Sequence, residues 1–225
     1  MKFKEASKES IKSTSTKVII NKINNQQEVK PFSRIMQFHS KAKLLSDNNS
    51  FGFSTTAMRD LSNFSLFDVE YEGVIYPTVE NAFQAQKYTC TEKPELVEVV
   101  RKLKTPLAAK SAGSKSGMKK YNVSLDIECW NQKRESLMRD LIKSKIARHP
   151  EIQEILSIVK REVIQLVHFS RTDMDWGAHM DNQNENVKKG NNLLGKIYMS
   201  AVDQSDEHYQ SINQTSLSSR SIRRT

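Results

Sequence analysis

Cysteine is scarce in this sequence, and long apolar runs are absent from it. Its 225 residues include two cysteines, Cys90 and Cys129, which lie far apart and have no cysteine or histidine at metal-ligand spacing. This pattern indicates neither a zinc site nor a disulfide framework, and two thiols suit a reducing compartment. No apolar run approaches the roughly 18 residues of a membrane-spanning helix, and no signal-peptide core follows the first residues. We therefore expect a cytoplasmic protein without a membrane partner.

The sequence also lacks the local patterns of several common enzymes. It has no Gly-x-Ser-x-Gly element, neither a Rossmann nor a P-loop glycine pattern, and no cysteine in a recognisable nucleophile setting. We accordingly predict no metal and no cofactor. The histidines show no metal-ligand spacing, and we interpret each as incidental to function: His39, His149, His168, His179 and His208.

Apolar residues are unevenly distributed along the chain. They make up 37% of the whole, but residues 1–33 are rich in Lys, Ser, Asn and Gln, and residues 203–225 are rich in Ser, Gln and Arg. Neither end can bury enough surface to offset the entropy of ordering, so both are predicted to be disordered. Residues 34–202 remain as one domain of a common size.

The formal net charge is +9, and residues 1–33 form a basic arm with seven lysines and three glutamates. The positive charge that remains in residues 34–202 suits an anionic ligand without requiring a polyanion. The arm could contact nucleic acid or an anionic surface, although a solvated tail is the simpler interpretation.

Apolar periodicity and turn residues predict a helix-rich α+β fold, a single compact domain with a small β-sheet or hairpin. Residues 64–76 alternate around a Glu72-Gly73 turn, which is typical of a β-hairpin. The β-branched segment 163–169 predicts a strand, and 178–189 predicts a polar loop. Thr78 suits the N-cap of a helix over 79–89. Further helices are predicted near residues 94–103, 105–110, 125–148, 151–158 and 191–201.

One face of the helix predicted over residues 79–89 carries polar groups. Glu80, Phe83, Gln84 and Lys87 stand at positions i, i+3, i+4 and i+7, so an acid, an aromatic ring, an amide and an amine share one side. A helix that only packs would place apolar residues there. The spacing alone nevertheless favours a solvated surface face over a functional one.

The longest predicted helix, 125–148, places five residues near one side. A Trp on such a helix belongs more often to a core than to a ligand platform. The residues on this side are Trp130, Arg134, Leu137, Leu141 and Lys145.

Two later segments have the composition of binding loops. Asp173-Met174-Asp175-Trp176-Gly177 follows an apolar strand, where a scaffold often positions binding groups, although a turn with a packed Trp fits equally well. Gly190 to Gly195 begins a helix whose N-terminal amides could receive an anion, but the segment matches no known phosphate-binding pattern.

Five blocks of the sequence can be compared with known families as a set. They are Leu61-Ser62-Asn63-Phe64, Tyr76 to Lys87, Trp130, Asp173-x-x-Trp176-Gly177 and Gly190-x-Asn192-x-Leu194-Gly195. Together and in this order they resemble the NADAR superfamily, the YbiA-like N-glycosidases. The blocks span nearly all of residues 34–202, which makes the match specific. The resemblance implies a metal-free glycosidase of compact α+β fold, and it favours functional interpretations of Glu80, Lys87 and Trp130.

Members of that family cleave ribosylamino-pyrimidine intermediates of riboflavin synthesis, or remove ADP-ribose from modified guanine bases. The resemblance thus implies hydrolysis of a ribosyl C1–N bond. The partner would be a phosphorylated, nucleotide-like small molecule, or a nucleic acid that carries ADP-ribosylated guanine. The catalytic residues implied are Glu80, Lys87 and Asp173. The substrate-binding residues implied are Asn63, Phe64, Gln84, Trp130, Trp176, Gly177, Gly190 and Asn192.

In the implied reaction, Glu80 stabilises the positive charge that develops at C1, and Asp173 passes a proton to the leaving group. Lys87 is either a cation for a phosphate or hydroxyl group, or an amine that forms a Schiff base with the sugar. The chain departs from the family's usual pattern in three residues and in a longer 178–189 loop, and these departures concern substrate choice more than activity. The departing residues are Leu61, His168 and His179.

Two other functions fit parts of the sequence. A non-catalytic module that binds ADP-ribose or another nucleotide would keep Trp130, Trp176 and Asn192 but would not need Glu80 or Lys87. A basic nucleic-acid-binding protein would account for the charge, and its salt-dependent binding would be largely lost with the N-terminal arm.

Overall fold

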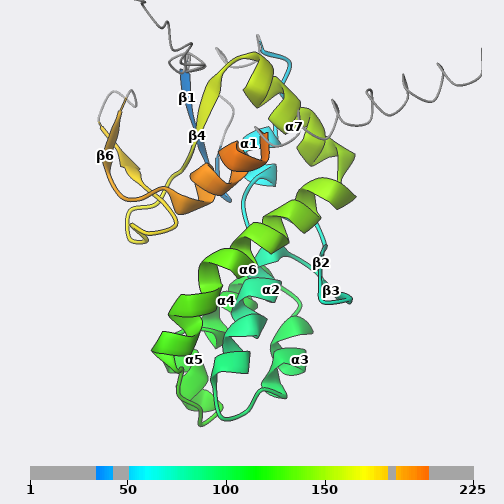
Figure 1. The fold of residues 1–225 in the computed structure, drawn as a ribbon, viewed down its shortest axis with the longest axis vertical. Helices are drawn as coiled ribbons and strands as arrows, with labels where there is room; N and C mark the ends of the chain where they lie inside the picture. The colour runs from blue at the N-terminus through cyan, green and yellow to red at the C-terminus, as the bar shows by residue number, and fades with distance from the viewer. Residues whose placement is uncertain (1–33, 43–50, 182–185, 203–225) are drawn as a thin grey trace, which may run out of the picture. The chain divides into compact units, whose positions relative to one another are not determined.

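Helix α6 (Ile127–Arg148) is the longest element, and helices from both sides of it in sequence pack along it (Figure 1). The computed structural model describes residues 34–42, 51–181 and 186–202; the two ends predicted to be disordered lie outside these ranges. Helix α6 begins where the Asp126 carboxylate accepts the backbone N–H groups of residues 128 and 129. It ends at His149, as predicted, because the residue before a proline is driven out of helical geometry.

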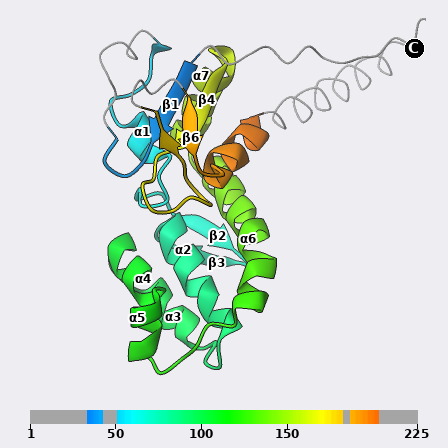
Figure 2. The ribbon, with the colours of Figure 1, turned by 90° about the vertical axis from the view of Figure 1, so that its left-hand side faces the viewer.

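Four short helices lie together beside the N-terminal part of α6 (Figure 2). Three of them start at a hydroxyl N-cap: Thr78, Thr105 and Ser114 each accept the backbone N–H three residues further on. Helix α5 was not predicted, since its sequence has little apolar periodicity. The four helices are α2 (Val79–Gln86), which continues into a 3-10 turn (Lys87–Cys90), α3 (Leu96–Arg101), α4 (Pro106–Ala112) and α5 (Lys115–Lys120).

The strands of the described residues form three separate two-stranded sheets instead of one small sheet. Strand β1 (Arg34–Phe38), which was not predicted, runs parallel to β4 (Ile164–His168). The polar loop predicted over 178–189 is wrong in part, because β5 (His179–Met180) pairs with β6 (Val187–Lys189) there. Helices α1 (Ala57–Asp60), α7 (Pro150–Arg161) and 193–202 lie near the β1–β4 pair (Figure 1).

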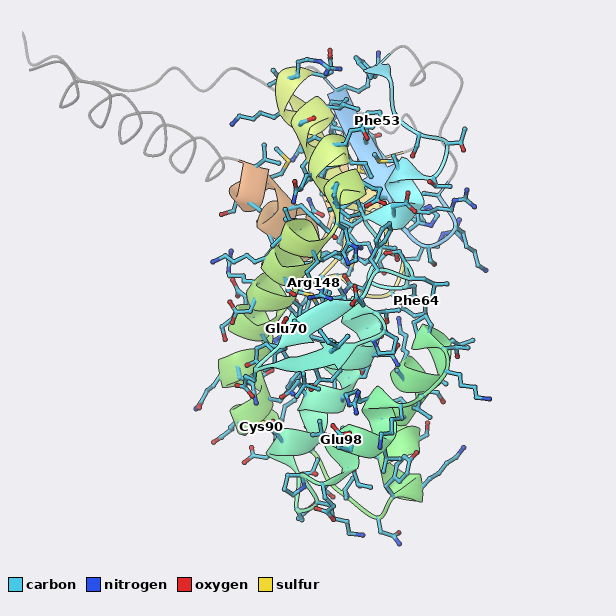
Figure 3. The ribbon with its side chains drawn as sticks, turned by 90° about the vertical axis from the view of Figure 1, so that its right-hand side faces the viewer. Phe53, Phe64, Glu70, Cys90, Glu98 and Arg148 are labelled. Atoms are coloured by element: carbon cyan, nitrogen blue, oxygen red, sulfur yellow. A yellow bond between two sulfur atoms is a disulfide. The ribbon has the colours of Figure 1, made fainter. Side chains whose placement is uncertain are left out.

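The predicted hairpin is present as β2 (Val69–Tyr71) and β3 (Val74–Tyr76), joined by Glu72 and Gly73 with positive φ angles. It is attached to the C-terminal end of α6, where Arg148 lies 2.7 Å from a carboxylate oxygen of Asp68 and 3.4 Å from one of Glu70 (Figure 3). The hairpin therefore fixes the point at which the chain enters α2. Among the described residues, no helix has the length and apolar character needed to cross a membrane.

The expectation of two unpaired thiols is wrong, because Cys90 and Cys129 form a disulfide with their Cα atoms 5.8 Å apart. The chain returns through α3, α4 and α5, so the end of the 3-10 turn meets the start of α6. There the backbone N–H of Asp126 donates to the Cys90 carbonyl at 2.8 Å. The sequence separation of 39 residues hides this proximity. The inference of a reducing compartment depended on two free thiols, so the disulfide removes the argument for it.

We expect the free energy of unfolding of the Cys129→Ser variant to be about 4 kcal/mol lower than that of the wild type. Cross-linking residues 39 apart removes that much chain entropy from the unfolded state in the loop-closure model. Urea unfolding with and without dithiothreitol measures the difference. The reductant should lower wild-type stability and leave the variant unchanged; equal sensitivity of both proteins would contradict the pairing.

Candidate active site

Helix α2 is buried along its whole length, and this determines what its polar face can do. All eight of its residues are buried, and α3, α4 and α6 pack against it. The face that carries Glu80, Phe83, Gln84 and Lys87 lines a cavity of about 620 Å³. That volume is typical of sites for nucleotide-sized ligands. The interpretation of this face as a solvated surface, which the spacing alone favoured, is therefore wrong.

The cavity is enclosed by segments from six parts of the chain. Trp130, Arg134 and Met138 come from α6, and Asn63 and Phe64 come from the turn after α1. On the opposite side, the cavity is lined by residues 39–41 and 168–173, which contain the carboxyl ends of the parallel strands β1 and β4 or directly follow them. Ligands commonly bind at such strand ends in α/β proteins. The end of α4 adds Lys110 and Gly113.

Glu80 lines this cavity and is 6% exposed. One of its oxygens accepts a hydrogen bond of 2.8 Å from the Gln84 amide. Burial raises the pKa of Glu80, while the Gln84 hydrogen bond and the nearby charges of Lys110 and Lys87 act in the opposite direction. A raised pKa keeps a larger fraction of this carboxyl group protonated at a given pH than an exposed glutamate would have.

Lys87 lies two turns further along the same face. Its amine donates to the Gly113 carbonyl at 3.2 Å and lies 5.6 Å from the Trp130 ring centroid. Burial lowers the pKa of Lys87, and the Glu80 charge partly offsets that effect. A lowered pKa increases the neutral, nucleophilic fraction of the amine.

Three aromatic rings form one wall of the cavity. Phe83 lies between the two indoles, with its ring centroid 4.9 Å from that of Trp130 and 5.4 Å from that of Trp176, both in tilted or edge-on geometry. The Arg134 guanidinium lies 5.8 Å from the Trp176 ring and forms an ion pair of 3.0 Å with Asp175. The wall provides flat apolar surface, which suits a planar ring in a ligand.

The Asp173 loop forms part of the cavity mouth. The backbone N–H of Asp173 donates to the Ser170 hydroxyl at 2.9 Å, and the Asp173 carboxylate accepts the backbone N–H of Trp176 at 3.1 Å. These two bonds fix the loop as a tight turn and place the exposed carboxylate beside the cavity. Gly177 closes the turn: a Cβ there would lie 2.6 Å from the Cβ of Ser170.

Eight of the eleven residues predicted for the site line the cavity. The three that do not are Gly177, Gly190 and Asn192. Asn192 has a positive φ of 51° and is 5% exposed. Its side chain accepts the His168 backbone N–H at 2.9 Å and donates to the Leu166 carbonyl at 3.0 Å. Asn192 thus holds the end of β4 in place, and its predicted contact with ribose or phosphate stays a prediction.

Three buried side-chain atoms of the described residues have no hydrogen-bond partner, and all three belong to residues that line the cavity. They are Asn63 Oδ1, Gln84 Oε1 and His168 Nδ1. A buried polar atom without a partner costs about 1–3 kcal/mol. The two amide oxygens are acceptors, so a ligand with hydroxyl or amino groups would satisfy them.

Sequence reasoning missed several residues of the cavity. His39 and His168 were interpreted as incidental, yet both line it, as do Lys110 and Arg171. Their positions depend on the β1–β4 pairing and on the return of α4, neither of which leaves a local signal. Within residues 34–42, 51–181 and 186–202, no three His, Cys, Asp or Glu side chains come together as a metal-binding group.

The fold and the cavity define a helix-rich α+β domain whose buried acid and amine face a nucleotide-sized site. The NADAR domain family matches residues 24–204. The chain belongs to this family, as the order of its sequence blocks predicted.

Named relatives agree with this assignment. The N-glycosidase YbiA of Escherichia coli K12 is 29% identical over 146 residues, which cover 64% of this chain and 80% of that protein. The Shigella boydii N-glycosidase YbiA is 30% identical with the same coverage. The N-glycosidase Npun_R5314 of Nostoc punctiforme is 29% identical over 143 residues, which are 64% of this chain and 83% of that protein.

The fold is also that of a solved structure. The NMR structure of the E. coli protein YbiA superposes with a TM-score of 0.58 at 22% identity, and covers 80% of this chain and 89% of the other. The expected helix-rich α+β fold of the YbiA type is therefore confirmed.

We expect the Glu80→Gln variant to change how stability depends on pH. Burial raises the folded-state pKa of Glu80 above its ordinary value of 4.5, so this group favours folding below that pH, and the benefit is lost as pH rises through the folded-state pKa. Relative to the variant, wild-type stability should therefore fall between pH 4 and pH 8. Urea unfolding at both pH values checks this, with the exposed Glu95→Gln as control. Parallel pH profiles for wild type and Glu80→Gln would contradict it.

Proposed function

We propose that this chain is an N-glycosidase that hydrolyses the bond between a ribosyl C1 and a nitrogen atom in a phosphorylated, nucleotide-like substrate. The observation that carries the proposal is the position of the buried Glu80, on α2, and the half-buried Lys87, at the start of the 3-10 turn that continues α2, because both border the same cavity. The names of the related proteins support the reaction type. A module that only binds a nucleotide would not need a buried acid and a half-buried amine that line one cavity.

The cavity suits such a substrate in three ways. Its aromatic wall offers a flat surface for a base, and stacking on an indole contributes on the order of 1–3 kcal/mol. The unpartnered oxygens of Asn63 and Gln84 can accept hydrogen bonds from ribose hydroxyls or from amino groups of a base. Lys110 and Arg171 supply positive charge for phosphate groups.

The reaction that these groups support is a substitution at C1. The neutral Lys87 amine attacks C1 and the C1–N bond breaks. The Asp173 carboxylate takes the proton that the lysine nitrogen loses and passes it to the departing nitrogen. The Glu80 carboxylate stabilises the positive charge that develops on the sugar. The lysine-linked sugar opens to a Schiff base, which water hydrolyses to free sugar and free amine. The lowered pKa of Lys87 favours this route over a purely electrostatic role.

We expect Glu80→Gln to keep the fold and to lose most turnover, because the shape of the side chain is retained while its charge is removed. Loss of one charge-stabilising group costs roughly 100- to 1,000-fold in kcat. The wild-type rate should rise with pH through a value above 4.5, because burial raises the pKa of Glu80. Steady-state kinetics over pH 4–8 measure both effects. Glu95→Gln should behave as wild type; a fully active Glu80→Gln would reject the assigned role.

We expect Lys87→Ala to abolish turnover, and borohydride to trap a sugar adduct on Lys87 of the wild type. The Schiff base is reduced to a stable secondary amine, which peptide mass spectrometry locates. The exposed Lys104→Ala serves as a matched control and should remain active. Near-normal turnover by Lys87→Ala, or trapping at another lysine, would eliminate the covalent route.

The substrate can be identified by direct comparison. The protein is incubated separately with a ribosylamino-pyrimidine phosphate and with DNA that carries ADP-ribosylated guanine, and the released sugar is followed by mass spectrometry. Release of ribose 5-phosphate or of ADP-ribose identifies the substrate class. Release from neither, under conditions in which E. coli YbiA serves as a reference enzyme, would count against the proposed activity.

A further inference from the structure

A lysine outside the cavity is the most deeply buried charged residue described. The side chain of Lys145, on α6, is 0% exposed. Its ammonium group donates hydrogen bonds to the carbonyls of Asp60 at 2.5 Å and Ser62 at 3.0 Å, and to the hydroxyl of Ser65 at 2.8 Å. It also lies 5.4 Å from the Phe67 ring centroid. The three protons of the ammonium thus match three oxygens of a single turn.

The other carbonyls of this turn are bonded by groups from two further helices. The Leu61 carbonyl accepts the hydroxyl of the buried Tyr198, at 2.9 Å, from helix 193–202. The Asn63 carbonyl accepts the backbone N–H of Glu80, at 3.0 Å, from the first turn of α2. Four successive carbonyls, 60 to 63, are therefore fixed from outside the turn, two of them by Lys145.

The same turn presents two residues to the cavity. Asn63 and Phe64 line it, and the Asn63 amide donates to the sulfur of Met138 at 3.7 Å. Met138 lies on α6, seven residues or two helical turns before Lys145, so both contact the turn from one side of that helix. A shift of the turn would move Asn63 directly and would move Glu80 through its backbone hydrogen bond.

We propose that Lys145 is a positioning residue for the reaction, which fixes the 60–65 turn and thereby sets the places of Asn63 and the first turn of α2 relative to the rest of the cavity. This inference rests on the proposed function, because it assigns Lys145 a part in that activity. Lys145 itself does not touch the substrate.

The energetics support a geometric role over a purely stabilising one. Removing an ammonium from water is costly, and well-packed apolar side chains of similar volume often stabilise a core equally or better. Burial lowers the pKa of Lys145 to about 7, whereas its three oxygen acceptors favour the charged form. A methionine would fill the space but would supply none of the three donors, so the Asp60 and Ser62 carbonyls would keep only their bonds from Ser65 within the turn. The lysine therefore supplies orientation that an apolar residue cannot.

The test compares Lys145→Met with Lys143→Met, which changes an exposed lysine on the same helix. We expect Lys145→Met to lower kcat roughly ten- to a hundredfold, because a small misplacement of reacting groups costs up to about that much. The change in KM should be smaller. Lys145→Arg should restore part of the rate, since it retains the charge and the donors. Kinetics are measured well below each variant's Tm, with circular dichroism to show that the protein is folded.

A milder variant keeps the test informative if Lys145→Met does not fold. Ser65→Ala removes one of the three acceptors of Lys145, together with the hydrogen bonding of the Ser65 hydroxyl to the Asp60 and Ser62 carbonyls, and retains the lysine. We expect it to fold and to lower kcat roughly fivefold or more, since the loss of one hydrogen bond is equivalent to about that factor. Wild-type kcat and KM in Lys145→Met, or in Ser65→Ala where the first does not fold, would overturn the inference.

Hydrogen exchange separates this inference from the proposed function. If the wild type turns over neither substrate, the proposed function fails, and the positioning can still be measured without substrate. We expect the Glu80 amide to exchange faster in Lys145→Met, or in Ser65→Ala where the first does not fold, and amides of α5 and α7 to exchange at the wild-type rate. An unchanged Glu80 amide, or an equal increase throughout the protein, would overturn the inference.

Discussion

The burial of the Glu80 carboxyl group, with the half-buried Lys87 amine just beyond the end of the same helix, is the constraint around which this structure is organised. Removing either group from water is unfavourable, and the surroundings of α2 offset that cost only in part. Glu80 lies in the first turn, where the helix dipole favours negative charge, and it accepts a hydrogen bond from Gln84. Lys87 has the Gly113 carbonyl and two aromatic rings nearby. These contacts do not fully offset the effect of burial, so the pKa of Glu80 is raised and the pKa of Lys87 is lowered.

The elements around α2 also pack closely against it. A Cβ atom at position 113 would lie 2.0 Å from the Gln84 amide oxygen, so any other residue where α4 ends against α2 would displace that amide. The Tyr88 hydroxyl donates to the Ala112 carbonyl at 2.8 Å in the same region. Phe83 of α2 contacts both indoles edge-on, with its ring centroid 4.9 Å from that of Trp130 and 5.4 Å from that of Trp176. The cavity therefore lies between elements that are each held by contacts with α2.

The parts of the fold that could be predicted from sequence are those with a local physical signal. The hairpin follows from alternation around Glu72-Gly73, α2 from its Thr78 cap, and the end of α6 from Pro150. The polar face of α2 could be identified from spacing, but its direction toward a cavity needed the family resemblance. Eight of the residues that the resemblance implied line the cavity, and their functional roles stay predictions.

The features that could not be predicted depend on contacts between distant segments. The disulfide of Cys90 and Cys129 exists because three short helices bring the chain back, and no spacing rule encodes that return. Asn192 has the sequence context of a ligand-binding residue, yet its amide bonds the backbone of β4. His39 and His168 reach the cavity only because β1 pairs with β4.

The β1–β4 pairing has a consequence for folding. Phe38, at the end of the first strand, aligns with His168, near the opposite end of the domain sequence. Contacts between residues so far apart close a large loop and form slowly compared with local helices. During synthesis, β1 leaves the ribosome early but must wait for β4 before it has a partner. The helical side of the cavity can therefore form first, and the wall that contains His39 and Lys41 is completed last.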